Sequence, residues 1–253
     1  MSEYIISDLR KDGKMNFEDF GIEMSQKADK LGIELSYEQI KKFFDYMNML
    51  ITWNEKMNLT SIIEEKDIIL KHFIDSFSIA SYIKDEDKVM DMGTGAGFPG
   101  IPLKIIKKDN SFVLVDSLNK RIQFLEEVKK ELSLEALELK HARAEELAKN
   151  KGYREQMDII TSRAVANLRV LVEYMLPFVK IGGNCICMKG PKVEEEIEEA
   201  NNAIDILGGK LIKVDHFYLP ESDIERNIVI IKKIRTTPSK YPRKAGTPLK
   251  QPL

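Results

Sequence analysis

The sequence lacks the features that mark secreted, membrane-spanning and disulfide-bonded proteins. Its 253 residues include only two cysteines, and no uninterrupted apolar stretch approaches the roughly 20 residues that a membrane-spanning helix needs. The first 14 residues are mixed and charged, without the apolar segment of a secretory signal. We therefore expect a cytoplasmic protein that has no membrane association.

The cysteines and histidines form no metal-binding pattern. Cys185 and Cys187 lie two positions apart in a segment with the pattern of a strand, so both point to one face and suit a buried core better than a disulfide. The three histidines, His72, His141 and His216, are scattered singly and far from the cysteines. No metal-ligand spacing results, and we expect no metal ion.

Neither sign of charge predominates, because the formal net charge is only -2. The charges are, however, unevenly distributed at the C-terminal end of the chain. Residues 232 to 253 carry seven lysines and arginines, four prolines and no acidic residue. Such a tail either neutralises nucleic-acid phosphates or is a solvated terminus, and composition does not choose between the two.

Up to about residue 85 the sequence predicts helices only. One helix should begin after Asn16 and another after Ser36, where Ser36 and Gln39 have the spacing of a capping box. A third helix has apolar residues at helical spacing between positions 70 and 80. Three polar residues lie on its other side: His72, Asp75 and Ser76. Such a group is more often a surface pair than a functional cluster.

After residue 86 the pattern changes to alternating strands and helices. Strands are expected at 89–92, 112–115, 137–139, 157–161 and 184–188, with helices between them and a stop at Gly182 and Gly183. The last two strands, 210–219 and 228–234, leave no room for a helix and should form an antiparallel hairpin at the sheet edge. The pattern predicts an α/β fold with a mostly parallel, seven-stranded sheet.

The segment from residue 89 to 100, VMDMGTGAGFPG, is the most informative part of the chain. An apolar strand is followed by four glycines within eight residues, which is how a strand turns sharply beneath a ligand before a helix begins. Alternating glycines cost conformational entropy on folding, and we expect few stabilising packing contacts from them. The helix beyond offers unpaired N–H groups. A nucleotide-like cofactor is therefore expected on this loop.

Two classes of cofactor suit the loop. Gly95, Gly97 and Gly100 satisfy the G-x-G-x-x-G fingerprint of dinucleotide-binding proteins. Asp91 extends the motif to D-x-G-x-G-x-G, which resembles the first motif of class I S-adenosylmethionine methyltransferases. Asp116, at the end of the second strand, can accept ribose hydroxyls in either class. An NAD-dependent oxidoreductase would need a separate substrate domain or a Tyr-x-x-x-Lys after the loop, and the sequence shows neither.

Five further motifs support a more specific resemblance. In chain order they are KHFIDS at 71–76, VDSLNKR at 115–121, TSRAVA at 161–166, MKG at 188–190 and YPRKAG at 241–246. Together with the glycine loop they resemble the RsmG (GidB) family over nearly the whole chain from about Tyr37. The resemblance implies a class I, Rossmann-like fold with S-adenosyl-L-methionine as cofactor. It also implies methylation of guanine N7 in bacterial 16S rRNA, in the loop near the decoding site.

The same resemblance implies the residues of the site. By position, the cofactor contacts are Gly93, Phe98, Ala144, Glu145 and Arg163, to which the loop and strand pattern adds Gly95 and Asp116. Four residues are candidates for RNA contact: His72, Arg121, Lys189 and Arg243. For His72, pairing with Asp75 as a buried structural pair is an equal alternative. Guanine N7 has an in-plane lone pair, so we expect alignment and electrostatics but no general base.

The sequence thus predicts three segments: an N-terminal helical extension (1–85), a cofactor-binding core (86–236) and a basic, proline-containing tail (237–253). The expected partner is 16S rRNA or a small-subunit particle, met by a monomer without an obligate protein partner. Two rival functions stay open at this point. One is an NAD-dependent oxidoreductase on the same loop, and the other is a non-enzymatic RNA-binding module, for which the basic tail is the main evidence.

Overall fold

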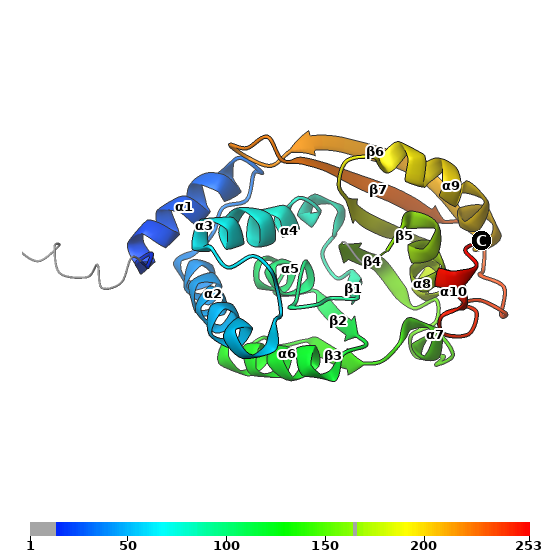
Figure 1. The fold of residues 1–253 in the computed structure, drawn as a ribbon, viewed down its shortest axis with the longest axis horizontal. Coiled ribbons are helices and arrows are strands. Elements are labelled where there is room, and N and C mark those ends of the chain that lie inside the picture. Colours follow the sequence, from blue (N-terminus) through cyan, green and yellow to red (C-terminus); the bar gives the residue numbers. More distant parts are fainter. Residues whose placement is uncertain (1–13, 164–165) are drawn as a thin grey trace, which may run out of the picture.

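The computed structural model describes residues 14–163 and 166–253, which leaves outside it the first 13 residues of the predicted extension and two residues of the TSRAVA motif. Its centre is a seven-stranded sheet in the order β3-β2-β1-β4-β5-β7-β6 (Figure 1). The strands are β1 (Lys88–Met92), β2 (Ser111–Asp116), β3 (Leu137–His141), β4 (Met157–Arg163), β5 (Val179–Lys189), β6 (Gly209–Tyr218) and β7 (Glu225–Lys233).

Strands β1 to β5 run parallel, and β7 lies antiparallel between β5 and β6. The predicted α/β fold and the C-terminal hairpin are therefore confirmed. The strand order reverses between β1 and β4, where Asp91 is in register with Thr161. In an open α/β sheet, such a reversal leaves a crevice at the carboxyl ends of the strands, which is where ligands bind.

Both faces of the sheet are covered because successive residues of the central strands alternate between two apolar cores. Val89 belongs to one core and Met90 to the other. On the first face lie α1 (Phe17–Asp29), α2 (Tyr37–Met57), α5 (Gly100–Ile106) and α6 (Asn119–Glu131). On the second lie α7 (Ala144–Leu147), α8 (Leu168–Met175), the 3-10 turn η3 (Leu176–Phe178) and α9 (Val193–Ile206) (Figure 1).

The N-terminal helices begin where the sequence predicts. The Asn16 side chain accepts a hydrogen bond from the N–H of Asp19, and Ser36 and Gln39 form the complete capping box. Phe20 of α1 and Phe43 of α2 are fully buried and share one continuous core with the first face of the sheet. The described part of the helical extension, residues 14–85, thus packs on the sheet and shares its core.

The third predicted helix is broken into short pieces. It consists of α3 (Glu65–Ile68), the π-helical turn η1 (Ile69–Ile74), α4 (Asp75–Phe77) and the 3-10 turn η2 (Ala80–Tyr82). Its predicted apolar side is buried, as Phe73 and Phe77 show, but the opposite side is covered as well, by β4 and β7. His72, Asp75 and Ser76 are all buried. The expectation that they form a surface pair is therefore wrong.

The glycines at 182 and 183 were expected to stop a helix, but they lie inside β5. Helix α8 ends at Met175, and η3 leads directly into the strand. A Cβ on Gly183 would lie 2.6 Å from the carbonyl oxygen of Asp158, so this glycine permits the close approach of β4 beside a register shift. The physical reason for the glycine is backbone packing and not helix termination.

The two cysteines lie in the core, as predicted. Cys185 and Cys187 are buried and unbridged, and their Sγ atoms are 3.7 Å apart. Among the described residues there is no group of histidine, cysteine and carboxylate side chains placed to hold a metal ion. In the same parts of the chain, no helix has the length and apolar character needed to cross a membrane.

Candidate functional site

The glycine loop after β1 is held by one buried carboxylate. Asp91 Oδ2 accepts hydrogen bonds from Thr94 Oγ1 at 2.6 Å and from the N–H of Gly100 at 2.9 Å. Burial raises the pKa of Asp91 to about 6, and these two hydrogen bonds oppose that rise. The carboxylate thus joins the end of β1 to both the start of the loop and the first turn of α5.

The loop needs glycine for two different reasons. Gly93, Gly95 and Gly97 all have positive φ, at 73°, 64° and 105°. A Cβ on Gly97 would lie 2.6 Å from Tyr46 Oη, whereas a Cβ on Gly95 would have no neighbour within 4 Å. The expectation of few packing contacts is therefore wrong for Gly97, which packs beneath α2. At Gly95 the space beside the main chain is open to a ligand.

A pocket of about 250 Å³ lies at the carboxyl ends of β1, β2 and β3. Its walls are Met92, Gly93, Val115, Asp116, Ser117, Ala142, Arg143, Ala144, Glu145, Tyr174, Gly246 and Leu249. Four of the seven predicted cofactor residues are among them: Gly93, Asp116, Ala144 and Glu145. Four residues predicted at successive strand ends thus share one pocket, which we call the cofactor pocket after that prediction.

Asp116 is already engaged by the protein itself. Its Oδ2 accepts from the N–H of Gly95 at 2.9 Å and from Arg121 Nη1 at 3.1 Å, and its Oδ1 accepts from the N–H of Leu118 at 2.8 Å. A carboxylate has about four acceptor positions, so roughly one is left for a ribose hydroxyl. Arg121 supports Asp116 and lines neither pocket described here, so its predicted contact with phosphate stays a prediction.

A second pocket, of about 670 Å³, lies beside the first at the ends of β4 and β5. It is lined by Ile62, Lys71, His72, Asp75, Arg163, Ala166, Asn167, Met188, Lys189, Gly190, Glu196 and Arg226. Ser162 Oγ donates to the carbonyl of Met92 at 2.7 Å, which joins the strand carrying Arg163 to the strand that borders the cofactor pocket. We call this cavity the cationic pocket, after its lysine and arginine side chains.

One buried carboxylate, Asp75, organises the cationic pocket. Its Oδ2 accepts from Arg163 Nη1 at 3.1 Å and its Oδ1 accepts from Arg226 Nε at 3.0 Å, although only 2% of the residue is exposed. Arg163 also donates to the carbonyl of Lys71 at 2.8 Å. Charge-assisted bonds of this kind hold a planar guanidinium in one orientation. Arg163, predicted as a cofactor contact, is thus placed in the neighbouring pocket.

The hydrogen bonds of His72 determine its protonation state. Its Nδ1 lies 2.8 Å from Nη2 of Arg163, and because a guanidinium only donates, Nδ1 must be the acceptor. The proton is then on Nε2, which donates to Thr60 Oγ1 at 3.0 Å. Burial, together with the charge of Arg163, lowers the pKa of His72 to about 3. The imidazole is held neutral with no free lone pair.

Phe98 lies between the loop and this network. Its ring stacks on His72 with 4.2 Å between centroids, and the guanidinium of Arg163 lies 5.1 Å from its centre. Phe98 is buried and lines neither pocket. Its predicted contact with the cofactor stays a prediction, and in this structure it supports the residues that line the cationic pocket.

The two remaining RNA candidates are engaged in ion pairs. Lys189 lines the cationic pocket, as expected for a residue at the end of β5, and its Nζ lies 2.6 Å from Glu196. Arg243 forms a bidentate pair with the fully buried Glu173 and lines neither pocket. Their contacts with RNA stay predictions, and Arg243 has a structural partner.

Several residues of these pockets carried no sequence signal. Arg226 comes from the C-terminal hairpin and belongs to none of the motifs. Lys71, in contrast, opens the KHFIDS motif, and its carbonyl accepts from Arg163. Tyr174 reaches the cofactor pocket from α8 itself. Leu249, and Gly246 at the end of the YPRKAG motif, reach it because the tail folds back over α8. Met92 and Val115 could have been predicted from the sequence, because each directly precedes a predicted site residue at the end of a strand.

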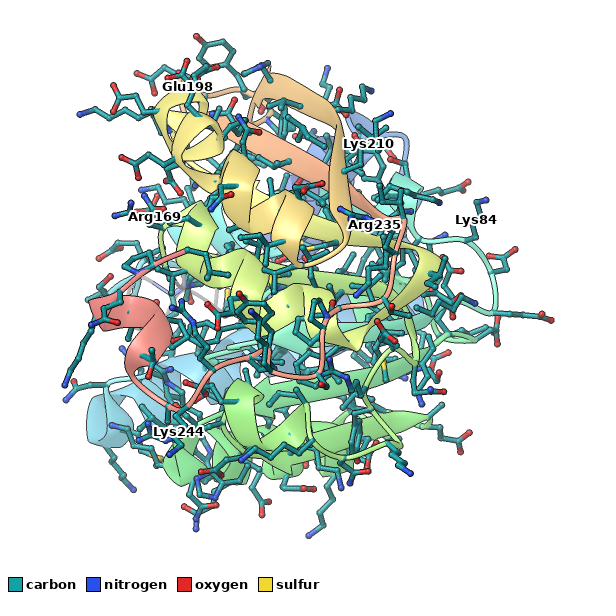
Figure 2. The ribbon with its side chains drawn as sticks, turned by 90° about the vertical axis from the view of Figure 1, so that its right-hand side faces the viewer. Lys84, Arg169, Glu198, Lys210, Arg235 and Lys244 are labelled. Atoms are coloured by element: carbon teal, nitrogen blue, oxygen red, sulfur yellow. The ribbon has the colours of Figure 1, made fainter. Side chains whose placement is uncertain are left out.

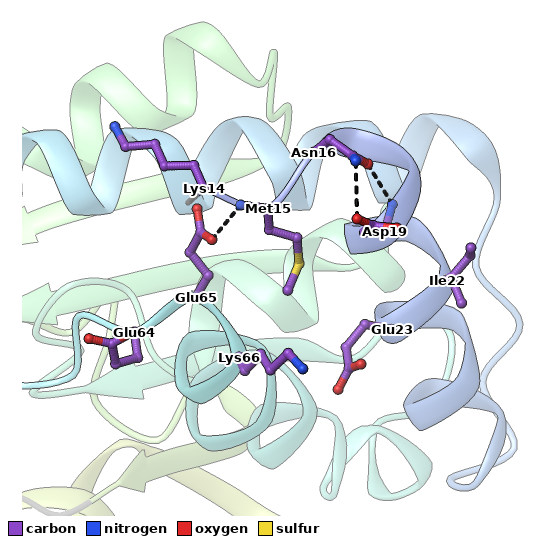
Figure 3. A pocket seen from close by; sticks show the side chains of 9 residues that line it. All are labelled: Lys14, Met15, Asn16, Asp19, Ile22, Glu23, Glu64, Glu65 and Lys66. Atoms are coloured by element: carbon purple, nitrogen blue, oxygen red, sulfur yellow. Dashed lines mark hydrogen bonds between the residues drawn. The ribbon is translucent and has the colours of Figure 1, made fainter. Parts of the chain in front are cut away.

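A third hollow, of about 640 Å³, lies between the start of α1 and α3 (Figure 3). Its wall is largely polar, and the Glu65 carboxylate accepts a hydrogen bond from the N–H of Met15 at 2.7 Å. None of the predicted site residues lines it. We therefore assign the functional site to the two pockets at the carboxyl ends of the strands.

The two roles of glycine in the loop predict different effects of the same substitution. Gly97→Ala should lower the free energy of unfolding by about 3 kcal/mol, because the new Cβ overlaps Tyr46 at a strained φ. The matched variant Gly95→Ala meets no neighbour and should lose about 1 kcal/mol from the left-handed φ alone. Denaturant unfolding measures both, and equal losses would contradict the distinction.

The neutral state of His72 predicts an unusual titration. Its pKa is lowered from 6.5 to about 3, so between these values the folded protein binds fewer protons than the unfolded chain. This group therefore stabilises the fold above pH 6.5 and loses that contribution as pH falls toward 3. Nitrogen-15 NMR of the imidazole should show an unchanged Nε2–H tautomer from pH 8 to about 5. A midpoint near 6.5 would refute the assigned geometry.

Comparison with solved structures agrees with the observed topology. M. jannaschii TYW2 in complex with AdoMet superposes with a TM-score of 0.50 at 19% identity, over 64% of this chain and 76% of that one. At this level of identity the likeness concerns the fold alone. The predicted class I S-adenosylmethionine-dependent methyltransferase fold is confirmed.

Comparison of sequences is more specific. The family model described as GidB, rRNA small subunit methyltransferase G, matches residues 39–229. A relative from Acetivibrio thermocellus, named ribosomal RNA small subunit methyltransferase G, is 54% identical and covers 89% of this chain and 93% of its own. One of the same name from Alkaliphilus oremlandii is 52% identical over 91% and 97%. The chain therefore belongs to the rRNA small subunit methyltransferase G (GidB) family.

Proposed function

We propose that the protein transfers a methyl group from S-adenosylmethionine to N7 of a guanine in 16S rRNA, in the loop near the decoding site. The observation that carries this proposal is the pair of adjoining pockets at the point where the strand order reverses. One is lined by strand ends and the glycine loop, and the other by cationic side chains. Membership of the rRNA small subunit methyltransferase G family supplies the substrate class.

The cofactor pocket suits the nucleoside end of this cofactor. When bound, S-adenosylmethionine supplies an electrophilic methyl group on sulfur. Asp116 has acceptor capacity for a ribose hydroxyl, and Ala144 and Glu145 border the space beside it. The open space over Gly95 leaves main chain accessible next to these groups. Gly93, Gly95, Asp116, Ala144 and Glu145 are the residues we assign to binding.

The cationic pocket suits a guanine that needs orientation and no base. The N7 lone pair is already available, so catalysis by this chain consists of alignment and electrostatic stabilisation. Arg163 and Arg226 are oriented by Asp75 and present donors, which match the O6 acceptor and phosphate oxygens of RNA. His72 cannot act as a base while Arg163 occupies its lone pair.

The setting of the reaction follows from the substrate. We infer that the protein acts in the cytoplasm on 16S rRNA or a small-subunit particle, as a monomer and without an obligate protein partner. Lys71 and Lys189 line the cationic pocket, and cations attract the RNA backbone.

Ligand preference separates this function from the oxidoreductase. S-adenosylhomocysteine at about 100 times its dissociation constant should stabilise the protein by roughly 2.7 kcal/mol, because only the native state binds it. NAD at the same concentration should leave the melting temperature unchanged. Stabilisation by NAD without stabilisation by S-adenosylhomocysteine would overturn the proposal. The product is checked by mapping N7-methylguanine in 16S rRNA from cells with and without the protein.

Replacement of the Arg163 guanidinium by another cationic group should reduce methylation activity. Arg163→Lys keeps the charge, but an ammonium cannot serve Asp75, His72 and the Lys71 carbonyl in the same planar geometry. We expect kcat/KM for RNA methylation to fall by about 100-fold. Arg169→Lys is the matched control, since Arg169 is exposed on α8 and should keep full activity. Full methylation by Arg163→Lys would remove Arg163 from the site.

A further inference from the structure

The basic C-terminal tail is anchored to the core along its first residues. The guanidinium of Arg154 donates to the carbonyls of Thr237 and Tyr241, both at 2.9 Å, and of Pro238 at 3.3 Å. The N–H of Thr237 donates to Glu155 at 2.8 Å, and its hydroxyl donates to the carbonyl of Leu207 at 2.7 Å. Residues 237–241 of the tail are thus held by the side chains of Arg154 and Glu155 and by the main chain at Leu207.

A second anchor lies next to the cofactor pocket. Arg243 donates through Nε and Nη2 to both oxygens of Glu173, at 2.9 and 2.6 Å, and its own N–H donates to the same carboxylate at 2.8 Å. Glu173 is fully buried in α8. A buried carboxylate without its partner costs several kcal/mol, so this pair fixes the tail firmly against α8. The residue after Glu173 is Tyr174, which lines the cofactor pocket.

From this anchor the tail turns back over the cofactor pocket. Gly246, with a φ of 81°, precedes the short helix α10 (Thr247–Lys250), which packs beside α8 (Figure 1). Figure 2 shows this part of the tail, with Lys244 at its outer side. Gly246 and Leu249 form a wall of the same pocket as Ala144 and Glu145. Leu249 is 63% exposed, so an apolar side chain stands uncovered at the pocket mouth.

We propose that the tail is part of the cofactor site, with Leu249 in contact with the adenosine portion of S-adenosylmethionine. This inference rests on the proposed function and deepens it. A flat, largely apolar base gains free energy when it covers a leucine side chain that is otherwise hydrated. The basic residue Arg243 then has a structural role, because it binds Glu173. An RNA-binding function of the tail is not required to explain it.

The test is calorimetric titration of the full chain with S-adenosylhomocysteine. Leu249→Ala should raise the dissociation constant by about fivefold, and Leu249→Asp by about 20-fold, because a carboxylate there opposes burial beside Glu145. Lys250→Ala, on the same short helix and exposed, is the matched control and should leave the constant within about twofold. Because Leu249 is exposed, the melting temperatures without ligand should coincide.

The outcomes separate the two proposals. If the wild-type chain does not bind S-adenosylhomocysteine, the proposed function fails. If it binds and the Leu249 variants bind equally well, only the role of the tail is overturned. A second measurement uses trypsin, which should cut after Lys244 and Lys250 about fivefold more slowly once the ligand covers the tail. Equal cleavage rates with and without saturating ligand would also overturn the inference.

Discussion

The structure depends on the buried carboxylate of Asp91, which holds the turn between β1 and α5. It receives donors from Thr94 and from the N–H of Gly100, so the loop between them has one shape. The same turn places the N–H of Gly95 on Asp116, which couples the ends of β1 and β2. Tyr46 of α2 donates to the carbonyl of Ala96 from the other side. The cofactor pocket is therefore built on a rigid loop.

A second buried carboxylate, Asp75, orients the arginine side chains of the cationic pocket, just as Asp91 holds the glycine loop. It comes from a helix segment, while the arginines that it orients come from β4 and β7. Two strands and the helical layer thus converge at one side chain. Because buried charges must be paired, this arrangement ties the substrate side of the site to the packing of the N-terminal helices.

Local patterns predicted a large part of the site. The glycine loop, Asp116 and the Ala144–Glu145 pair each follow a strand, and parallel strands bring their carboxyl ends to one edge, so Gly93, Asp116, Ala144 and Glu145 share a pocket. Local reasoning failed for the polar side of residues 70–80, because Arg163 and Arg226, from two strands distant in the sequence, bury Asp75. It also failed at Gly97, whose need for glycine comes from Tyr46, 51 positions earlier.

The sequence by itself determined the order of strands and helices, the capped starts of α1 and α2, the terminal hairpin and the glycine loop after β1. These follow from hydrophobic period, capping and backbone preference, which act over a few residues. Only the tertiary structure decided that Arg226 joins Asp75, that Arg243 binds Glu173 and that Leu249 borders the cofactor pocket. The two ion pairs join positions 151 and 70 residues apart, and no local periodicity encodes which of many charged residues will meet.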